Sequence, residues 1–422
     1  MNRSPLNSAS LNSAPLGRRS FLQTSSSLLA LLSLARTSPW LLADDAKLPT
    51  ADQWIPGKDP RLIVHSIKTG EIETPIALLR EHAITPKSIL FVRNNQLLEN
   101  SLSLEPAPMA ERWPVVLSGL VDQQRTITVG ELAKLPQHEV TLVLQCSGNS
   151  RSRFSKTVKA DGIQWTNGAI ANLTFRGPKL ADVLAHLGVK LSSEVRFVAA
   201  EGKEGPVAEG KPDFEHSLPL EVVLERTIIA LEMNGESLAI AHGGPARLIT
   251  PGYYATMNVK WLSALRFEAR ESDNYHHVGR YRTPYVPLTP GSKFESTIEN
   301  SEPNWDMKIK SLVFAPLEGE QLKAGPTTIS GIAFNGGQAK IAAVEVSLDQ
   351  GATWQRAQLE YAKSPYAWHT WKVAVDLKPG KQTIQSRAVD VLGHSQPLDG
   401  SIHWNPAGYV WNGVDEVSVE VT

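Results

Sequence analysis

The chain of 422 residues contains one cysteine, Cys146. A single thiol cannot close an intramolecular disulfide, so no such bond stabilises the fold. It also excludes cysteine-rich zinc sites, iron–sulfur clusters held by cysteines and a C-x-x-C-H haem attachment. Apolar packing must hold the chain together, and a hydrophobic content of 41% is ordinary for a globular protein. The roles left for Cys146 are a buried filler, a nucleophile or one soft metal ligand.

The length and the charge of the chain limit its organisation and its partners. At roughly 100–200 residues per domain, the length predicts two or three domains. The 42 lysines and arginines are balanced by 43 aspartates and glutamates, for a formal net charge of -1. Nucleic-acid binding rests on phosphate contacts from an excess of basic residues. We therefore expect no nucleic acid as a partner.

The first 43 residues have the pattern of an export signal. The arginine pair at 18–19 precedes S-F-L, a short apolar run follows over 28–34, and small residues occur at Ala35 and Ala43. Such an order defines a signal peptide, and the arginine pair resembles a bacterial twin-arginine signal. We expect residues 1–43 to direct the protein to the periplasm, with a disordered basic leader as the alternative. No segment reaches the ~18 apolar residues of a membrane span.

Residues 50–305 mix short apolar strands with a few helical segments. Residues 74–82 (TPIALLREH) predict a helix, with Thr74 as N-cap and Pro75 at its first position. Residues 178–187 (PKLADVLAHL) predict a second helix, which Gly188 closes. Residues 140–144 (VTLVL) predict a strand that ends at the loop containing the cysteine. Strand-to-loop junctions on a rigid scaffold are common places for chemistry.

From residue 308 onward the pattern becomes all-β. Apolar residues alternate over 344–348 and again over 371–377, which is the period of half-buried strands. Asp-Gln-Gly at 349–351 and Pro-Gly after residue 378 supply turns, and Trp354 begins a returning strand. Short strands without a helical pattern predict an immunoglobulin-like β-sandwich over 308–422. We place its boundary in the polar segment 299–308.

Taken alone, the loop around Cys146 leaves the role of this cysteine open. A buried, inert cysteine is the commoner case for such a pattern. Arg151 and Arg153 favour the thiolate, which is also the form that a soft metal site uses as a ligand. The chain has 11 histidines, but no local signature of a cysteine–histidine hydrolase occurs.

The segment 145–151 (QCSGNSR) closely resembles the Q-C-x-G-N-x-R motif of the sulfite oxidase family of molybdenum enzymes. Further segments resemble the family's motifs in the same order: EHAITP at 81–86, FVRNN at 91–95, Trp165 with GAI at 168–170, EMNG at 232–235, HGGPAR at 242–247, PG at 251–252 and VKWL at 259–262. The resemblance implies an α+β molybdopterin-binding catalytic domain over 50–305. It is followed by an all-β immunoglobulin-like domain over 308–422, similar to the family's dimerisation domain, which offers a route to a homodimer.

The resemblance also implies the cofactor, an oxo-molybdenum centre on a single pyranopterin. Cys146 is then the only metal ligand that the protein supplies. The phosphate and polar edges of a pterin call for cations and amides around it. The positions that match the family's cofactor-binding residues are Phe91, Arg93, Asn94, Asn95, Cys146, His242, Arg247, Asn258 and Lys260. We expect no haem in this chain, because the adjacent His276 and His277 border the active-site loop instead of binding one.

Sulfite is a small dianion, and arginine offers it a planar fork of donors that stays charged. Arg93 and Arg151 match the family arginines of the substrate pocket, and Trp165 matches an aromatic residue that closes it. Tyr281 matches the active-site tyrosine, although Arg280 precedes it where the family has aspartate. Two other tyrosines close by in sequence, Tyr275 and Tyr285, compete for this assignment.

Three positions depart from the family's vertebrate members. Residues 404–408 (WNPAG) lack the third pocket arginine of the family's W-N-x-R-G. Asn95 replaces the histidine of R-N-H, and Met257 stands where an arginine precedes V-K-W-L. The missing third arginine implies weaker binding of the anion or a different substrate. In the family, an acidic residue also contacts the cofactor. A loose alignment matches it to Glu201.

The function that these residues predict is sulfite dehydrogenation. Sulfite and water give sulfate, two electrons and two protons, and the electrons leave to an external c-type cytochrome. One alternative is a sulfoxide reductase of the same superfamily, although the C-terminal sandwich disfavours it. The other alternative is a non-enzymatic periplasmic binding protein built on the sandwich.

Overall fold

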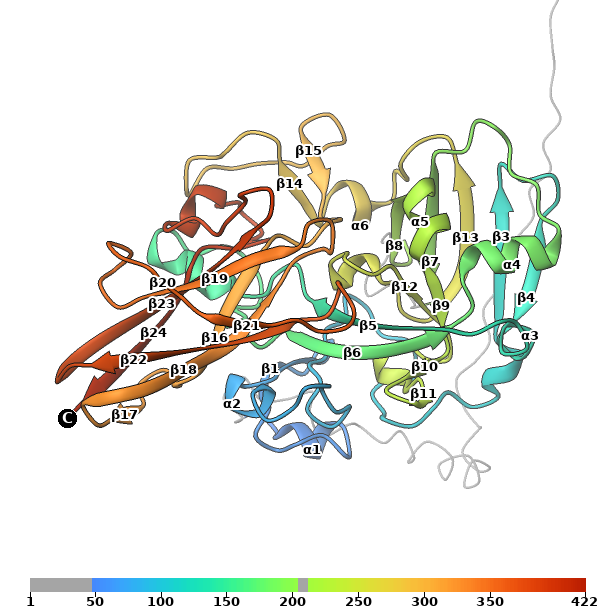
Figure 1. Ribbon diagram of the computed structural model, residues 1–422. Coiled ribbons are helices and arrows are strands. Elements are labelled where there is room, and N and C mark those ends of the chain that lie inside the picture. The colour runs from blue at the N-terminus through green and yellow to red at the C-terminus, as the bar shows by residue number, and fades with distance from the viewer. Residues whose placement is uncertain (1–47, 204–211) are drawn as a thin grey trace, which may run out of the picture. The chain divides into compact units, whose positions relative to one another are not determined.

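A long antiparallel hairpin formed by β5 (His138–Gln145) and β6 (Ile170–Gly177) is the central element of the fold (Figure 1). The computed structural model describes residues 48–203 and 212–422. The proposed signal peptide lies outside these described residues. β5 contains the strand predicted over 140–144, and its last four residues are buried. Cys146 follows β5 directly, where its N–H donates to the carbonyl of Ala169 at 2.9 Å.

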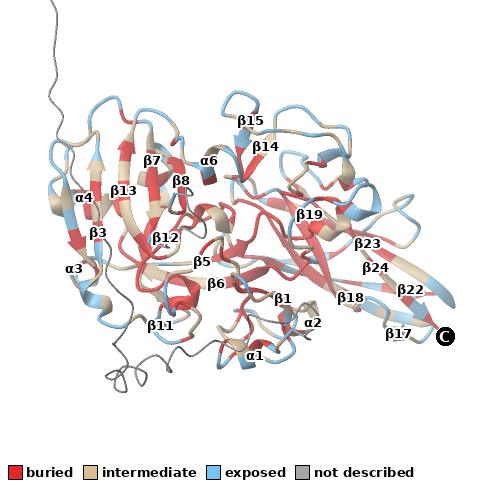
Figure 2. Cartoon of the chain, turned by 180° about the vertical axis from the view of Figure 1, so that it is seen from behind, coloured by how far each residue is buried: buried red, intermediate tan, exposed pale blue. Residues whose placement is uncertain are grey.

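The hairpin belongs to a four-stranded sheet with β10 (Glu232–Met233) and β11 (Glu236–Ser237). A second sheet of the catalytic part is antiparallel except for the parallel pair β3–β13. Its strands, in spatial order, are β4 (Arg125–Thr128), β3 (Pro114–Gly119), β13 (Leu262–Glu268), β7 (Phe197–Gly202) and β8 (Glu215–Pro219). The buried apolar residues of the second sheet mostly belong to the largest apolar core, whereas those of β5 and β6 lie mostly in another cluster; buried residues are red in Figure 2.

Three helices accompany these sheets: α3 (Val129–Leu132), α4 (Leu180–Leu187) and α5 (Leu220–Arg226). α4 confirms the helix predicted over 178–187, although Pro178 and Lys179 precede its first turn. Gly188 closes α4 with a left-handed φ of 63°, as its sequence position predicts. The helix buries Leu180 and Val183 in the largest apolar core and exposes His186.

The N-terminal part of the described chain contains α1 (Ala51–Trp54), β1 (Ile63–Ser66), β2 (Glu71–Glu73) and α2 (Ile76–Leu79). α2 is shorter than the helix predicted over 74–82, and its N-cap is Pro75. Thr74 cannot cap the helix because its hydroxyl donates to the carbonyl of Ile89 at 2.6 Å. The chain then turns toward β6, where the N–H of Thr85 donates to the carbonyl of Asn172.

The remaining short elements surround the hairpin and the connection to the C-terminal part. The strands are β9 (Ile228–Ala230), β12 (Arg247–Ile249), β14 (Arg282–Pro284) and β15 (Ser301–Pro303), and the last helix is α6 (Tyr275–Val278). The 3-10 helices are η1 (Ala110–Arg112), η2 (Arg151–Lys156), η3 (Ile240–His242), η4 (Ala255–Met257) and η5 (Gly400–His403). β15 pairs with β14 inside the predicted boundary segment 299–308, so this segment is structured.

The C-terminal part is a sandwich of two sheets, which confirms the predicted fold class. One sheet has the order β16 (Lys310–Ala315), β18 (Gly325–Phe334), β22 (His369–Leu377) and β21 (Gln358–Glu360). The other has the order β17 (Gln321–Leu322), β24 (Asp415–Val421), β23 (Gly380–Asp390), β19 (Ile341–Ser347) and β20 (Gln355–Arg356). Buried and exposed residues alternate strictly along β22, as the pattern over 371–377 predicts.

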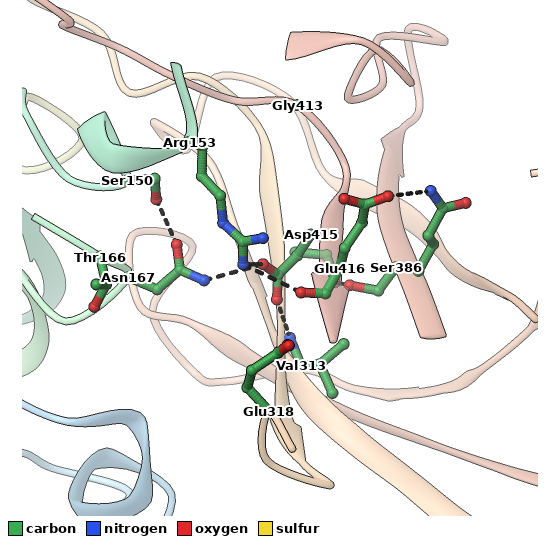
Figure 3. A network of polar contacts seen from close by, with 12 residues as sticks. Ser150, Arg153, Thr166, Asn167, Val313, Glu318, Ser386, Gly413, Asp415 and Glu416 are labelled. Carbon is green, nitrogen blue, oxygen red and sulfur yellow. Dashed lines mark hydrogen bonds and ion pairs between the residues drawn. The ribbon is translucent and has the colours of Figure 1, made fainter. Parts of the chain in front are cut away.

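A buried polar network joins the sandwich to the loop that follows Cys146 (Figure 3). Asp415 accepts hydrogen bonds from Asn167 at 3.0 Å, from Arg153 at 2.9 Å and from the N–H of Val313 at 2.9 Å. The other end of the Asn167 amide accepts from the hydroxyl of Ser150 at 2.6 Å. Removing one partner of such a buried charge typically costs about 3–5 kcal/mol. The network therefore ties the Cys146 loop to the C-terminal domain.

Lys310 extends this network from the sandwich side. Its Nζ donates to the hydroxyl of Ser150 at 2.7 Å and to the carbonyl of Trp411 at 3.2 Å. Burial lowers the pKa of Lys310 to about 7, although Asp415 opposes the shift. The native state thus binds the Lys310 proton more weakly than the unfolded state does.

We expect Lys310→Met to change how stability depends on pH. Between pH 7 and about 10 the unfolded chain holds the Lys310 proton that the native protein loses, so native stability rises with pH. The stability of the wild type relative to the variant should increase by up to about 1.4 kcal/mol per pH unit in this window. Chemical denaturation at several pH values measures the difference, and a difference that stays constant would contradict the assignment.

Candidate active site

A single cavity collects nearly all of the residues that the sequence predicts for the site. It encloses about 680 Å³, counted out to its open mouth. The residues of this set that line it are Phe91, Arg93, Asn94, Asn95, Cys146, His242, Arg247, Asn258, Lys260 and Tyr281. They come from segments that lie far apart in the sequence, including the loop after β5 and the chain between η3 and β13. Arg151 and Trp165 do not line this cavity.

Cys146 occupies the cavity wall at the end of β5. Its side chain is buried within an apolar cluster that includes Phe91 and Leu144. The N–H of Gly148 donates to its Sγ at 3.4 Å. The thiol is the one free cysteine of the chain. The sulfur is therefore placed to act as a ligand to a group inside the cavity.

Arg151 is held rigidly beside this loop. Its Nε donates to the carbonyl of Ala407 at 2.8 Å, and its Nη1 donates to the carbonyl of Ile163 at 2.7 Å. A Cβ on Gly148 would lie 2.5 Å from Nη2 of Arg151, and one on Gly408 would lie 2.6 Å from its Cγ. Only glycine allows the side chain to pass this closely. Burial lowers the pKa of Arg151, and the electrostatic effect of Cys146 opposes this shift.

Arg93, Asn95 and Tyr281 form a closed triangle of hydrogen bonds in the cavity. Nη2 of Arg93 donates to Oδ1 of Asn95 at 2.7 Å and to the hydroxyl of Tyr281 at 3.1 Å. The Tyr281 hydroxyl in turn donates to Oδ1 of Asn95 at 2.9 Å. Tyr281 is 4% exposed, whereas the competing Tyr275 and Tyr285 are 39% and 58% exposed. The structure thus places Tyr281, and neither competitor, in the cavity wall.

The C-terminal domain contributes an aromatic residue that the sequence did not reveal. The ring of Tyr409 stacks on Tyr281, with centroids 5.0 Å apart and planes inclined by 23°. The guanidinium of Arg151 lies 5.5 Å from the centre of the Tyr409 ring. Tyr409 follows closely after Ala407, the position of the missing third arginine. In the sequence, the one signal that pointed to Tyr409 was its position directly after the segment 404–408, which matches the family's W-N-x-R-G motif.

The other end of the cavity is strongly cationic. Arg247 donates from Nε to the carbonyl of Asn258 at 3.0 Å and from Nη1 to the carbonyl of His242 at 2.9 Å. Burial lowers the pKa of Arg247 to about 9. Lys260 bonds to the side chain of Asn94. Burial, Lys58, Lys260 and Arg247 together lower the pKa of His242 well below its ordinary value, which shows how closely these cations gather.

Lys58 is a second functional residue that the sequence did not reveal. Its Nζ donates to the carbonyls of Lys87 at 2.7 Å and Leu90 at 2.6 Å, and it lies 3.1 Å from Nε2 of His242. Three acceptors match the three donors of an ammonium group. Nε2 of His242 therefore accepts, and its Nδ1 carries the proton. Burial, followed by nearby Lys260, lowers the pKa of Lys58 well below its ordinary value.

Two family models match the chain, in agreement with this geometry. The oxidoreductase molybdopterin binding domain matches residues 104–276, and the Mo-co oxidoreductase dimerisation domain matches residues 301–421. The mitochondrial sulfite oxidase of Mus musculus is 33% identical over 395 residues, covering 91% of this chain and 69% of that protein. The sulfite oxidase of Arabidopsis thaliana is 28% identical and covers 84% and 92%. The chain belongs to the sulfite oxidase family.

A solved structure supports the same conclusion for the fold of this sulfite oxidase family member. The sulfane dehydrogenase SoxCD from Paracoccus pantotrophus superposes with a TM-score of 0.70 at 25% identity. The match covers 95% of this chain and all of that one. Together with the family models, it identifies a molybdenum-dependent oxidoreductase whose catalytic domain is followed by a β-sandwich domain.

The residues of the cavity fit a molybdopterin. Arg247 is a buried cation whose hydrogen-bond partners among the described residues are backbone carbonyls, so an anionic group is needed to balance its charge. Phosphate meets that need, and Lys260, which lines the same cavity, supplies a second cation. At the opposite end, Cys146 offers the soft sulfur that molybdenum requires. Arg247, His242 and Lys260 would thus hold the phosphate, and Cys146 would hold the metal.

Trp165 is fully buried next to the cavity instead of lining it. It belongs to the same apolar cluster as Cys146 and Phe91, and its indole contacts the ring of His65 edge-on at 5.0 Å. His65 is fixed by the buried carboxylate of Glu73 at 2.7 Å. The Trp165 Nε1 makes no hydrogen bond within the described part of the chain.

The structure shows what surrounds Asn95 and Met257, which depart from the family pattern, and Glu201, which was loosely aligned with a family residue. Asn95 accepts from both Arg93 and Tyr281, so its amide organises the pocket where the family has an imidazole. Met257 is fully buried in the main core. Glu201 forms an ion pair with Arg266 at 2.7 Å and is not part of the cavity lining.

Arg247→Gln should release the cofactor without unfolding the protein. The change removes a charged donor from the cationic end, and one charge-assisted hydrogen bond contributes about 1.5–3 kcal/mol. We expect the molybdenum and pterin content of the purified variant to fall by about tenfold or more. Arg176→Gln is the matched control, because Arg176 pairs with Glu232 on the surface. Full cofactor content in Arg247→Gln would refute the phosphate assignment.

Proposed function

We propose that this enzyme is a periplasmic sulfite dehydrogenase that oxidises sulfite to sulfate and passes electrons to an external c-type cytochrome. The observation that carries the proposal is the gathering of Cys146, Arg93 and Tyr281 in the lining of one cavity with a cationic end, with Arg151 held beside the cysteine loop. We also propose that the cofactor has a single pyranopterin and that the chain carries no haem. One cysteine ligand suffices for such a centre.

In this proposal, each residue near Cys146 has a different role. When bound, the cofactor supplies the oxygen-atom chemistry and takes up the two electrons. Cys146 holds the metal, while Arg93 and Arg151 attract the anion toward it. Both guanidinium groups keep their positions as charge moves during the reaction, because hydrogen bonds and packing fix them beforehand.

Tyr281 positions a proton at the substrate in this proposal. Its hydroxyl accepts from Arg93 and donates to Asn95, so its orientation is determined on both sides. The stacked ring of Tyr409 prevents Tyr281 from rotating away. A substrate oxygen bound beside Arg93, Asn95 and Tyr281 would form a hydrogen bond in place of one that these three residues make with each other.

We expect Cys146→Ser to abolish sulfite-dependent reduction of cytochrome c in the purified holoenzyme. Loss of the sulfur ligand removes the metal attachment, whereas the cationic end still holds the pterin phosphate. The variant should thus retain pterin in its mass spectrum. Undiminished turnover in Cys146→Ser would show that the ligand assignment is wrong.

Arg93→Gln tests the substrate role of the arginines. We expect KM for sulfite to rise by about tenfold or more, because a buried charge-assisted contact to the anion is lost. Arg80→Gln is a suitable control, since Arg80 is exposed at the end of α2. An unchanged kcat/KM for sulfite in Arg93→Gln would argue against an anionic substrate at this position.

We propose export by the twin-arginine route, on the sequence of residues 1–43. No helix among the described residues is long and apolar enough to cross a membrane. Replacement of both Arg18 and Arg19 by lysine should retain the protein in the cytoplasm, as fractionation of an expressing bacterium would show. Export of that variant at the wild-type level would refute the proposed route.

We further propose a homodimer through the C-terminal domain. The support is the match of residues 301–421 to a dimerisation domain. Sedimentation analysis of the full chain tests this arrangement, and a monomer at micromolar concentration would refute it.

One observation favours a second substrate class, sulfane sulfur. The position of the third pocket arginine is Ala407, and the uncharged Tyr409 beside it in sequence stacks on the cavity residue Tyr281. A pocket with fewer cations suits a less charged sulfur compound. The superposed structure is that of a sulfane dehydrogenase. Comparison of kcat/KM for sulfite and for a persulfide, with cytochrome c as acceptor, decides between the two substrates.

A further inference from the structure

A row of polar side chains leads from the cavity wall toward the surface. Thr256 in η4 lines the cavity. Its Oγ1 lies 3.1 Å from Nε2 of His216 on β8, and Nδ1 of His216 lies 3.2 Å from Nδ1 of His277 on α6. Nε2 of His277 lies 2.9 Å from a carboxylate oxygen of Glu271. Four groups from four segments form an unbroken chain of hydrogen bonds.

The two ends of this chain have different surroundings. His216 and His277 are completely buried. Thr256 faces the cavity, whereas the Glu271 side chain is 14% exposed to solvent. His216 also contacts the pocket residue Tyr281 edge-on, with ring centroids 5.4 Å apart. The row of side chains therefore offers a route from the cavity wall to solvent through buried residues, separate from the open mouth of the cavity.

A backbone contact determines the direction of every hydrogen bond in the chain. The N–H of Ser217 donates to Nδ1 of His277 at 3.4 Å, so this nitrogen accepts and the proton of the ring is on Nε2. Nε2 of His277 then donates to Glu271, and Nδ1 of His216 donates to His277. Nε2 of His216 is left to accept from Thr256. All donors thus point from the cavity toward the surface.

The surroundings of this hydrogen-bonded row lower the pKa values of its two histidines and of Glu271. Burial, followed by His277, His276 and Arg282, lowers the pKa of His216 well below its ordinary value. Burial also lowers the pKa of His277, although Glu271 opposes this shift. For Glu271, burial raises the pKa, but hydrogen bonds from His277 and Arg282 outweigh it and the net pKa is lowered. Both imidazoles are therefore neutral, and the terminal carboxylate readily returns a proton to water.

We propose that Thr256, His216, His277 and Glu271 conduct protons from the cavity to solvent during turnover. The inference rests on the proposed function, in which sulfite and water give sulfate, two protons and two electrons. The electrons leave to the external one-electron acceptor. Each proton enters at Thr256, and the proton on Nε2 of His277 moves to Glu271 and then to water. The transfer leaves each imidazole protonated on the opposite nitrogen, and a turn of each ring about its Cβ–Cγ bond restores the starting arrangement before the second proton enters.

His277→Gln interrupts proton transfer while keeping the hydrogen bonds. The glutamine oxygen can accept from Ser217 and His216, and its amide can donate to Glu271, but an amide does not relay protons at neutral pH. In weak buffer we expect kcat to fall by about tenfold or more, within the usual range for general acid–base groups. KM for sulfite should not change. High concentrations of imidazole should restore kcat, because a soluble base replaces the missing relay.

His138→Gln is the matched control. His138 forms a histidine–carboxylate pair with Asp182 at 2.9 Å on the surface, at the end of β5 that lies away from Cys146. It should behave as the wild type in both buffers. Wild-type kcat for His277→Gln in weak buffer would overturn the relay. A loss that imidazole does not restore would also overturn it, because the effect would then be structural.

A second measurement is independent of turnover. Nitrogen-15 spectra of histidine-labelled full-length protein report the tautomer of each imidazole. We expect His216 protonated on Nδ1 and His277 protonated on Nε2, both neutral at pH 7. The reverse tautomer or a charged ring at either position would overturn the relay. Wild-type protein that shows the expected tautomers but does not oxidise sulfite would refute the proposed function and leave the oriented chain established.

Discussion

Buried positive charge is the constraint on which the site depends. Arg247 has carbonyl partners and no carboxylate among the described residues, and Lys58 is satisfied by two carbonyls and an imidazole. Desolvating a cation without a counter-ion is unfavourable by several kcal/mol. A structure that keeps such cations together gains stability when an anion binds. The cavity is therefore shaped for a phosphate-bearing cofactor, and the remaining residues are arranged around that requirement.

The metal end depends on contacts between the two domains. Arg151 is oriented by the carbonyl of Ala407, and Tyr281 is held by the ring of Tyr409. Both partners belong to the C-terminal part of the chain. Asp415 and Lys310 attach the loop after Cys146 to the sandwich by buried hydrogen bonds. The sandwich therefore completes the active site in addition to any role in pairing two chains.

Local patterns predicted the regular elements well and their ends less well. β5, α4 and the alternating strands of the sandwich follow from residues that are neighbours in sequence. The helix predicted over 74–82 begins late because Thr74 is held by long-range partners: its N–H donates to the carbonyl of Gly168 and its hydroxyl to that of Ile89. It ends early because the chain after Arg80 continues in tighter turns, in which Glu81 and His82 donate to carbonyls three residues back. The contacts of Thr74 join distant segments, so no local pattern contains them.

The sequence by itself determined the family, the fold class and many of the residues that line the cavity, because these appear as motifs of contiguous residues around Cys146, Arg93 and Arg247. Only the tertiary structure decided which of the competing tyrosines enters the cavity and that Lys58 and Tyr409 belong to the site. It also revealed the chain from Thr256 to Glu271. The physical reason is that hydrogen bonding and stacking act over a few ångströms in space, and these residues are brought within that range only when the sheets and the sandwich have packed.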